Sequence, residues 1–148
     1  MTEPQANRQL IERWVERFNV GDIDGLLAMF TEDANNFGRQ VGREGLRAVL
    51  VDIYTRFPDA RLAVHDWIAD DDRVAFRATY SGTHRGVGRL PVDGGMLIGV
   101  PPTNRAFAVL HLHVFHIENG FITEHWGARD DIGMMRQLGL LPPPAPTP

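Results

Sequence analysis

The sequence predicts an α+β fold, with helices in its N-terminal part and a largely antiparallel sheet after them. Apolar residues recur at helical spacing up to Phe57, where Pro58 ends the pattern. From Arg61 the period changes to two, as in half-buried strands. Asn119-Gly120 then separates two runs rich in β-formers, which is a strong hairpin signal. Helices segregated from an antiparallel sheet are typical of the α+β class, and a curved sheet packed on helices leaves a concave face that can hold a ligand.

Three helices are expected before the sheet. The first covers 5–20, the second follows a cap at Asp22 and continues to Phe30, and the third begins at Gly42. The segment 31–42 is polar and is expected to be irregular. The apolar stripe of the first helix consists of Leu10, Ile11, Trp14, Val15 and Phe18.

About four strands and a short final helix are expected in the rest of the chain. Two strands cover 61–69 and 74–82 around a turn of three aspartates, which is better interpreted as a solvated hairpin tip than as a calcium loop. The Gly- and Pro-rich segment 83–103 is expected to be a long loop that serves as a lid or an oligomer contact. The hairpin around Asn119-Gly120 follows, then a helix over 132–138 and a proline-rich tail over 142–148.

The register of the last hairpin decides which of its side chains share a face. A two-residue loop would pair Glu118 with Phe121, and His113 with Trp126. A three-residue loop beginning at Glu118 would pair Ile117 with Phe121 and His113 with His125, and it is favoured because it sets two apolar residues side by side.

The two faces of this hairpin differ in chemistry. The face expected to line a cavity carries His111, His113, Phe115, Thr123, His125 and Gly127. The face expected to form a core or an interface carries Leu110, Leu112, Val114, Ile122, Trp126 and Ala128, with His116 directed outward.

Length and composition limit the possible function classes. A chain of 148 residues with 43% hydrophobic and 23% charged residues is expected to be one globular domain with an ordered core over about 5–141. The net charge of −4 and the lack of a basic stripe argue against a nucleic-acid partner. The absence of cysteine excludes disulfides and thiolate chemistry and fits a cytoplasmic location. The polar N-terminus and the lack of a long apolar run predict neither a signal peptide nor a membrane span.

Six short motifs, in order along the chain, resemble the SnoaL-like polyketide cyclases of the nuclear transport factor 2-like superfamily. They are G-R-E-G-L at 42–46, F-P-D-A-R-L at 57–62, G-T-H at 82–84, G-V-P-P-T at 99–103, N-G-x-I-x-E-H-W at 119–126 and R-Q-L-G at 136–139. The resemblance covers about Leu10 to Leu141. It implies a cone-shaped α+β barrel with a deep apolar pocket, commonly in a homo-oligomer such as a dimer or tetramer.

The resemblance also implies a chemistry. The cyclases close a ring of a polyketide ester by intramolecular aldol condensation, with no metal and no organic cofactor, and need a general base and a donor for the enolate. The pocket histidine of the family falls on His113, the asparagine after the second helix on Asn36, and the histidine of the G-x-H-x-G turn on His84. The acid/base aspartate of the cyclases falls on Gly127, which cannot move a proton, whereas a second acidic position is retained as Asp130.

These considerations select the candidate site. His113, His125 and Asp130 are the candidate catalytic residues, although Asp130 or Asp131 can equally cap the final helix. A metal site of three histidines is not expected, since no matched carboxylate accompanies them, and Arg105 and Arg129 are expected to be solvated edge charges. The candidate substrate-binding residues, some of which also fit plain core packing, are Trp14, Phe18, Asn36, Tyr54, His84, His111 and Phe115.

Three functional hypotheses follow. In the first, the protein is a cofactor-independent enzyme that acts by acid/base chemistry on a hydrophobic, polyketide-derived molecule, with His113 as the leading proton carrier. In the second, the same fold catalyses isomerisation, dehydration, epoxide opening or cofactor-less hydroxylation, as the glycine at position 127 favours. In the third, the chain is a non-catalytic binding module whose histidines only hydrogen-bond a small molecule.

Overall fold

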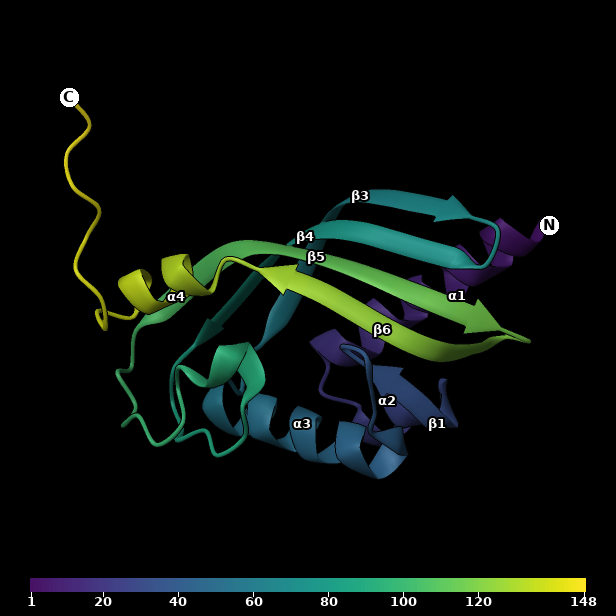
Figure 1. The fold of residues 1–148 in the computed structure, drawn as a ribbon, viewed down its shortest axis with the longest axis horizontal. Coiled ribbons are helices and arrows are strands. Elements are labelled where there is room, and N and C mark those ends of the chain that lie inside the picture. The colour runs from purple at the N-terminus through teal and green to yellow at the C-terminus, as the bar shows by residue number, and fades with distance from the viewer.

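Six strands form one curved sheet, and helices cover its concave side (Figure 1). In this computed structural model the described residues are 1–92 and 95–148. The helices are α1 (Glu3–Asn19), α2 (Ile23–Leu27), α3 (Gly42–Arg56) and α4 (Asp131–Gln137), with a 3-10 turn η1 (Val92–Gly95). The strands are β1 (Phe30–Asn36), β2 (Arg39–Gln40), β3 (Arg61–Asp70), β4 (Arg73–Thr83), β5 (Ala106–Glu118) and β6 (Phe121–Arg129).

The sheet is mixed and open, in the order β2-β1-β6-β5-β4-β3. The long meander from β3 to β6 is antiparallel, and β1 is added to β6 in parallel. The predicted α+β class is therefore confirmed. Because β2 and β3 remain as edges, helices rather than strand pairing close the cone.

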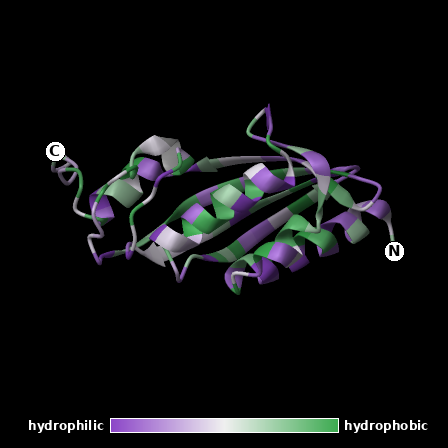
Figure 2. Cartoon of the chain, turned by 90° about the horizontal axis from the view of Figure 1, so that it is seen from below, coloured by the Kyte–Doolittle hydropathy of each residue, from purple (hydrophilic) through white to green (hydrophobic). Residues whose placement is uncertain are grey.

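The N-terminal helices lie across the concave side of the sheet, as a view from below shows (Figure 2). Thr2 and Gln5 form a capping box that begins α1. The buried stripe of α1, which includes Ile11, Trp14 and Phe18, packs on β3 and β4, and α3 packs on β1. Asp22 caps α2 as predicted, because its side chain accepts a hydrogen bond from the amide of Gly25.

The prediction for 28–41 was wrong, since this segment forms β1 and β2 instead of a helix end and an irregular stretch. The turn between them uses Phe37 and Gly38, both with positive φ (52° and 77°). β1 is held by β6, a strand almost ninety residues later in the chain, which no local pattern could indicate. Its last pair joins Asn36 to His125, so the stretch of β6 from Trp126 onward extends past the end of β1.

The last hairpin has the two-residue loop, contrary to the favoured prediction. Asn119 and Gly120 both have positive φ (50° and 79°), as a type I′ turn requires, and Glu118 pairs with Phe121. A bulge then shifts the register, so that His116 pairs with Glu124. The two-residue loop alone would exchange the two faces of β6 relative to the favoured prediction. The extra residue, Thr123, shifts the pairing by one more residue and exchanges them back, so the predicted faces are restored. His113 consequently lies opposite Gly127, and His111 opposite Arg129, on the expected concave face.

The long loop after β4 is fixed to α3. The amides of Arg85 and Gly86 donate to the carbonyl oxygen of Arg56, and the amides of Arg89 and Leu90 donate to Oδ1 of Asp52. Asp52 in turn faces Arg56, with 3.1 Å between Oδ2 and Nε, and the arginine side chain is fully buried. A charged pair on α3 therefore anchors the first half of this loop.

Among the described residues, no helix combines the length and apolar character needed to cross a bilayer.

Candidate active site

Three histidines and an asparagine form a continuous hydrogen-bonded chain on the concave face. Nδ1 of His111 lies 3.2 Å from Nε2 of His113, and Nδ1 of His113 lies 2.8 Å from Nε2 of His125. Nδ1 of His125 lies 2.8 Å from Oδ1 of Asn36. β5 supplies His111 and His113, β6 supplies His125, and the parallel pairing of β1 with β6 brings Asn36 alongside. We call these four residues the histidine chain.

The amide oxygen of Asn36 fixes the direction of the histidine chain. Because this oxygen only accepts, Nδ1 of His125 carries the hydrogen, and Nε2 of His125 accepts from His113. By the same logic His113 accepts from Nδ1 of His111 at its other nitrogen. His113 therefore donates to His125 and accepts from His111, and the terminal ring nitrogen of the chain is Nε2 of His111.

Aromatic rings enclose the histidine chain. Phe76 stacks on His113 at a centroid distance of 4.8 Å, and Tyr80 lies 4.2 Å from His111. Phe115 stacks on His125 at 4.8 Å. Trp14, from α1, lies 5.9 Å from both His113 and His125. The expected apolar enclosure is therefore present, but rings occupy much of the space beside His113, which is buried, whereas His125 and Asn36 are only half-buried.

This environment keeps the imidazoles neutral. Burial and the neighbouring charges of Arg129 and His125 lower the pKa of His111 to about 3, and burial and Arg129 lower the pKa of His125 to about 3. Burial, the other two histidines and Arg129 hold the pKa of His113 well below its ordinary value. At neutral pH the chain is thus an uncharged array of donors and acceptors, and Arg129 supplies the positive charge.

Arg129 is not the solvated edge charge that the sequence led us to expect. It lies opposite His111 in the β5–β6 register, on the concave face, and its side chain is only 22% exposed. Its Cζ lies 5.5 Å from the ring centroid of Phe37, and its Nε lies 3.5 Å from Oδ1 of Asp131. A permanent cation therefore adjoins the terminal residue of the histidine chain.

Gly127 and Phe37 form the edge of the site. A Cβ at position 127 would lie 3.3 Å from Cζ of Phe37 and 3.7 Å from Nδ1 of His113. A side chain here would thus point at the histidine chain, but the Phe37 ring, which is 37% exposed, occupies this space. Phe37 also lies edge-on to His125, at a centroid distance of 5.6 Å.

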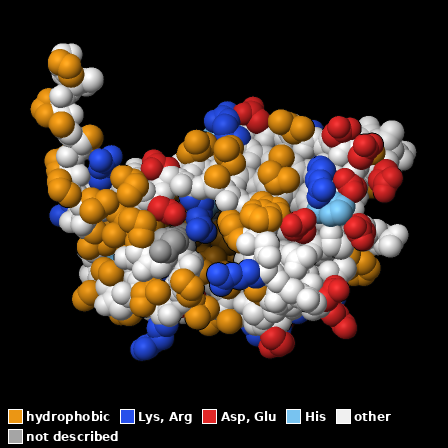
Figure 3. All heavy atoms as spheres, viewed as in Figure 1, with side chains coloured by type: hydrophobic (Ala, Val, Ile, Leu, Met, Phe, Trp, Pro, Cys, Tyr) orange, Lys and Arg blue, Asp and Glu red, His pale blue; other side chains and the backbone are white. Residues whose placement is uncertain are grey.

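The surface is hollowed on one face of the molecule. Figure 3 shows a depression between two positively charged side chains, with hydrophobic side chains within it, in the region where Figure 1 has the end of β6 and α3. Two cavities, of about 480 Å³ beside the start of α1 and of about 240 Å³ along Leu110, Leu112, Ala128, Arg129 and Asp130, are not lined by the histidine chain.

Comparison with known proteins places this geometry in a family. The profile of the SnoaL-like polyketide cyclases matches residues 8–138, which is most of the chain. This chain belongs to the SnoaL-like polyketide cyclase family. Its sequence is 26% identical over 146 residues to the aklanonic acid methyl ester cyclase DauD of Streptomyces sp. (strain C5), covering 94% of this chain and 83% of DauD.

Solved structures of similar proteins have the same architecture. TsrD from Streptomyces laurentii superposes with a TM-score of 0.79 at 28% identity, covering 95% of this chain and all of TsrD (100%). IdmH from Streptomyces antibioticus gives a TM-score of 0.73 at 30% identity, covering 93% of this chain and 99% of IdmH. The fold expected from the sequence resemblance is therefore confirmed.

In this SnoaL-like protein, most of the predicted site residues come together. His113, His125, His111 and Asn36 form the histidine chain, and Trp14 and Phe115 pack on it. Phe18 is one layer further away, stacked on Trp14 at 5.5 Å. Tyr54 contacts Phe18 and donates its hydroxyl to the Phe18 carbonyl oxygen at 2.7 Å. Burial and the nearby Asp22 raise the pKa of Tyr54, so this phenol remains protonated.

Two predicted site residues are placed elsewhere. Asp130 is exposed and caps α4, with Oδ1 2.8 Å from the amide of Gly133, which is the capping alternative. His84 is fully buried, and its Nδ1 accepts a hydrogen bond from the amide of Thr103. Its ring packs on Phe57, and its Nδ1 lies against Thr103 of the long loop rather than against the histidine chain. The structure therefore gives His84 a role in fixing the end of the long loop, where its own carbonyl oxygen accepts from Asn104.

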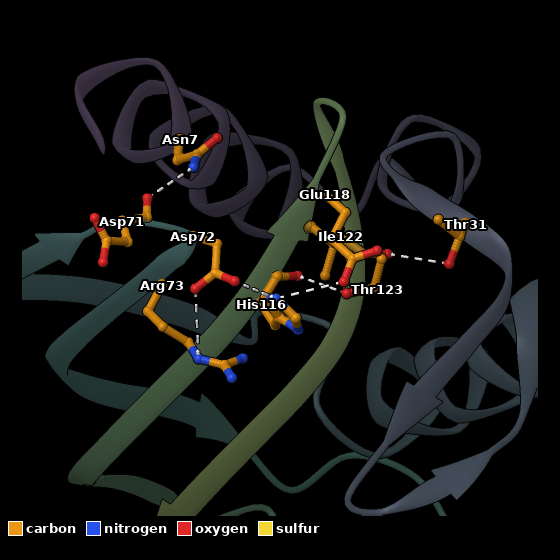
Figure 4. A network of polar contacts seen from close by, with 9 residues as sticks. All are labelled: Asn7, Thr31, Asp71, Asp72, Arg73, His116, Glu118, Ile122 and Thr123. Carbon is orange, nitrogen blue, oxygen red and sulfur yellow. Dashed lines mark hydrogen bonds and ion pairs between the residues drawn. The ribbon is translucent and has the colours of Figure 1, made fainter. Parts of the chain in front are cut away.

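His116 lies outside the site, on the convex side. Its Nε2 is 2.6 Å from Oδ2 of Asp72 at the tip of the β3–β4 hairpin, and Figure 4 shows this contact with the neighbouring side chains of Arg73 and Glu118. The expectation that His116 is directed outward is thus confirmed, although it is half-buried by its acidic neighbours.

Sequence reasoning missed four side chains of the site: Phe37, Phe76, Tyr80 and Arg129. Phe76 and Tyr80 could have been predicted from the sequence, because their spacing puts them on the same face of β4. This strand pairs with β5, and Phe76 lies directly opposite His113. Arg129 could also have been predicted, since it lies two residues after Gly127 and therefore on the same face of β6. No sequence pattern indicated Phe37, because its position depends on the parallel pairing of β1 with β6.

Proposed function

We propose that this SnoaL-like protein is an enzyme of polyketide metabolism that closes a ring of a hydrophobic substrate by acid/base chemistry. We also propose that the enzyme needs neither a metal nor an organic cofactor. The proposed function is supported by the family and by the similarity to DauD, a cyclase of aklanonic acid methyl ester. The observation that carries it is the histidine chain, a path for protons inside an aromatic enclosure.

The proposed reaction is an intramolecular aldol closure. A proton leaves the carbon next to a substrate carbonyl and passes to Nε2 of His111. The resulting enolate carbon attacks a second carbonyl carbon of the same molecule, forming the ring bond and an alkoxide. The alkoxide then takes up the proton, so that the reaction is an isomerisation in which the protein ends unchanged.

The histidine chain can move the positive charge of this proton from His111 to the other two rings. When Nε2 of His111 is protonated, its Nδ1 hydrogen can pass to His113, and the Nδ1 hydrogen of His113 can pass to His125. The charge then lies on a ring whose Nδ1 hydrogen bonds to the oxygen of Asn36. The low pKa values disfavour a long-lived imidazolium, which suits a proton that is borrowed and returned within one turnover.

A second candidate function keeps the site and changes the reaction. The absence of a carboxylate at Gly127, where the sequence resemblance implied an acid/base aspartate, favours a reaction other than aldol closure. The alternatives are isomerisation, dehydration, epoxide opening and cofactor-less hydroxylation. A binding module without turnover is the remaining alternative.

We also propose that the protein acts in the cytoplasm as a homo-oligomer whose copies pack through the convex face of the sheet. This face exposes 40–48% of four large apolar side chains on β5 and β6, namely Leu110, Leu112, Val114 and Trp126. Contiguous apolar patches of this kind mark interaction surfaces.

The experiment is a turnover assay on aklanonic acid methyl ester and related polyketide methyl esters. His111→Gln keeps a donor for His113 but cannot accept the proton, so we expect turnover to fall by at least about 100-fold. His116→Gln is the matched control on the opposite face of the same strand and retains wild-type turnover. Tight binding without turnover by the wild-type protein would favour the binding module. Equal turnover of the two variants would contradict the proton path.

A further inference from the structure

Phe37 covers the part of the histidine chain that reaches the surface. His111 and His113 are buried, at 5% and 8% exposure, whereas His125 is half-buried. Phe37 lies edge-on to His125, and its Cζ is 3.3 Å from the place that a Cβ on Gly127 would take. The same place is 3.7 Å from Nδ1 of His113. A molecule in the position of the Phe37 ring would therefore lie beside two of the three histidines.

The backbone of Phe37 is fixed, but its ring is not enclosed. Its amide donates to the carbonyl oxygen of His125 at 3.0 Å. The next residue, Gly38, packs on Trp126, since a Cβ there would lie 3.0 Å from Cη2 of the indole. The Phe37 ring is nevertheless 37% exposed, because its turn precedes the two-residue strand β2 at the edge of the sheet. A change of rotamer therefore moves the ring away from the site without breaking the turn.

The backbone conformation of Phe37 is unfavourable, and such residues gather at functional sites. Its φ is +52°, in the left-handed region that bulky side chains rarely adopt. Glycine or asparagine would form this turn at lower cost. The contacts of the aromatic ring are instead with the site, because it lies against His125 and has Cζ of Arg129 5.5 Å from its centroid.

We propose that Phe37 is a gate and a specificity-determining residue, whose ring holds the place that one ring of the substrate takes during turnover. The substrate class is therefore a planar molecule of fused aromatic rings. A flat ring in this place repeats the edge-on contact with His125 and fits against Gly127, which has no side chain. The inference rests on the proposed function, because the gate controls access to the same histidine chain.

The test measures the binding of 2-naphthol, a fused aromatic alcohol, by stopped-flow fluorescence and calorimetry. Phe37→Ala removes the ring that must be displaced, so we expect the association rate and the affinity to rise by about tenfold. Phe37→Trp puts a larger ring in the same place and should lower both. A fixed wall of the site would give the opposite sign, because its removal takes away surface on which the ligand packs.

Two controls accompany the test. Phe121→Ala removes an aromatic ring of similar exposure, 44%, at the tip of the last hairpin, and should keep wild-type binding. Decahydro-2-naphthol has the same carbon skeleton without planarity, and it should gain less from Phe37→Ala than 2-naphthol does. An equal gain for both alcohols would overturn the planar substrate class. Unchanged or weaker binding of 2-naphthol by Phe37→Ala would overturn the gate, as would a failure of all these proteins to bind it.

A second readout follows the ring itself. In the free protein, ring hydrogens of Phe37 and His125 should give a nuclear Overhauser effect, since their ring centroids are 5.6 Å apart. Saturation with 2-naphthol should abolish this effect, and its persistence in the complex would overturn the gate.

Failure of the gate and failure of the proposed function are distinguishable. If Phe37→Ala binds 2-naphthol more tightly but His111→Gln retains turnover, the gate stands and the proton path fails. If turnover depends on His111 but Phe37→Ala binds more weakly, the proton path stands and the gate fails.

Discussion

Nδ1 of His113 lies 2.8 Å from Nε2 of His125, although the two residues are not cross-strand partners. His113 pairs with Gly127 and His125 pairs with Phe115, so the contact runs diagonally across the hairpin. A glycine opposite His113 leaves room for this diagonal, because it has no side chain to separate the rings. The bulge at Thr123 is what sets the two histidines at this spacing.

The pH dependence of stability should report the histidine chain. The pKa of His111 and of His125 is lowered to about 3 in the folded state, against an ordinary value of 6.5. Between these values the unfolded chain binds protons that the folded chain does not, so stability is complete above about pH 6.5 and falls as the pH decreases. Each such histidine contributes up to about 1.4 kcal/mol per pH unit in this window.

The measurement is urea unfolding between pH 7 and pH 5, above the range in which most carboxylates titrate. His111→Gln should flatten the slope, because it removes one of the groups. A free energy of unfolding that does not change over this interval would show that the imidazoles are not held neutral.

Replacement of Asn36 should change the tautomers. Asn36→Asp places a carboxylate 2.8 Å from Nδ1 of His125, if it keeps the position of the amide oxygen, and should raise the pKa of that histidine. Asn36→Leu leaves the Nδ1 hydrogen of His125 without this acceptor, which should reduce turnover and cost about 1–3 kcal/mol of stability. Imidazole ¹⁵N shifts distinguish the two tautomers, and unchanged shifts in Asn36→Leu would contradict the direction assigned to the chain.

An aspartate at position 127 should be crowded by Phe37 and by the backbone of Leu112. The Cβ of Gly127→Asp would lie 3.3 Å from both Cζ of Phe37 and the carbonyl oxygen of Leu112, so we expect a cost of about 1–3 kcal/mol from overpacking. The double variant Gly127→Asp/Phe37→Ala relieves only the contact with Phe37, so it should recover part of this cost and place the carboxylate beside Nδ1 of His113. A gain of ring closure in the double variant, assayed on polyketide methyl esters, would support aldol chemistry, and a loss would favour another reaction.

The pair of Asp52 and Arg56 should hold the long loop. Asp52→Leu removes a carboxylate that faces the fully buried guanidinium of Arg56, and it removes the acceptor of two loop amides, so we expect a loss of about 3–5 kcal/mol. Asp52→Asn retains an oxygen acceptor and removes only the charge. Hydrogen exchange at Arg89 and Leu90 should therefore accelerate more in Asp52→Leu, and equal protection in the two variants would contradict this anchor.

The convex face should control the oligomeric state. Leu112→Glu introduces a charge into the exposed apolar patch, which disfavours burial against a second copy. Light scattering after size exclusion should show a lower mass for this variant than for the wild type. Ile132→Glu, an exposed apolar position on α4, is the control and should leave the mass unchanged. A wild-type protein that elutes as a monomer would contradict the predicted oligomer.

The sequence by itself determined the helices, the four long strands and the face that bears His111, His113 and His125, because these follow from the periods of 3.6 and 2 along a local stretch of chain. Only the tertiary structure decided the chemistry of the site. The contacts of Asn36 and Phe37 with His125 come from parallel pairing between distant segments, and the diagonal from His113 to His125 comes from a one-residue bulge. The position of Arg129 beside His111 follows from the same bulge. Such contacts depend on register and on long-range pairing, which leave no periodic trace in a sequence.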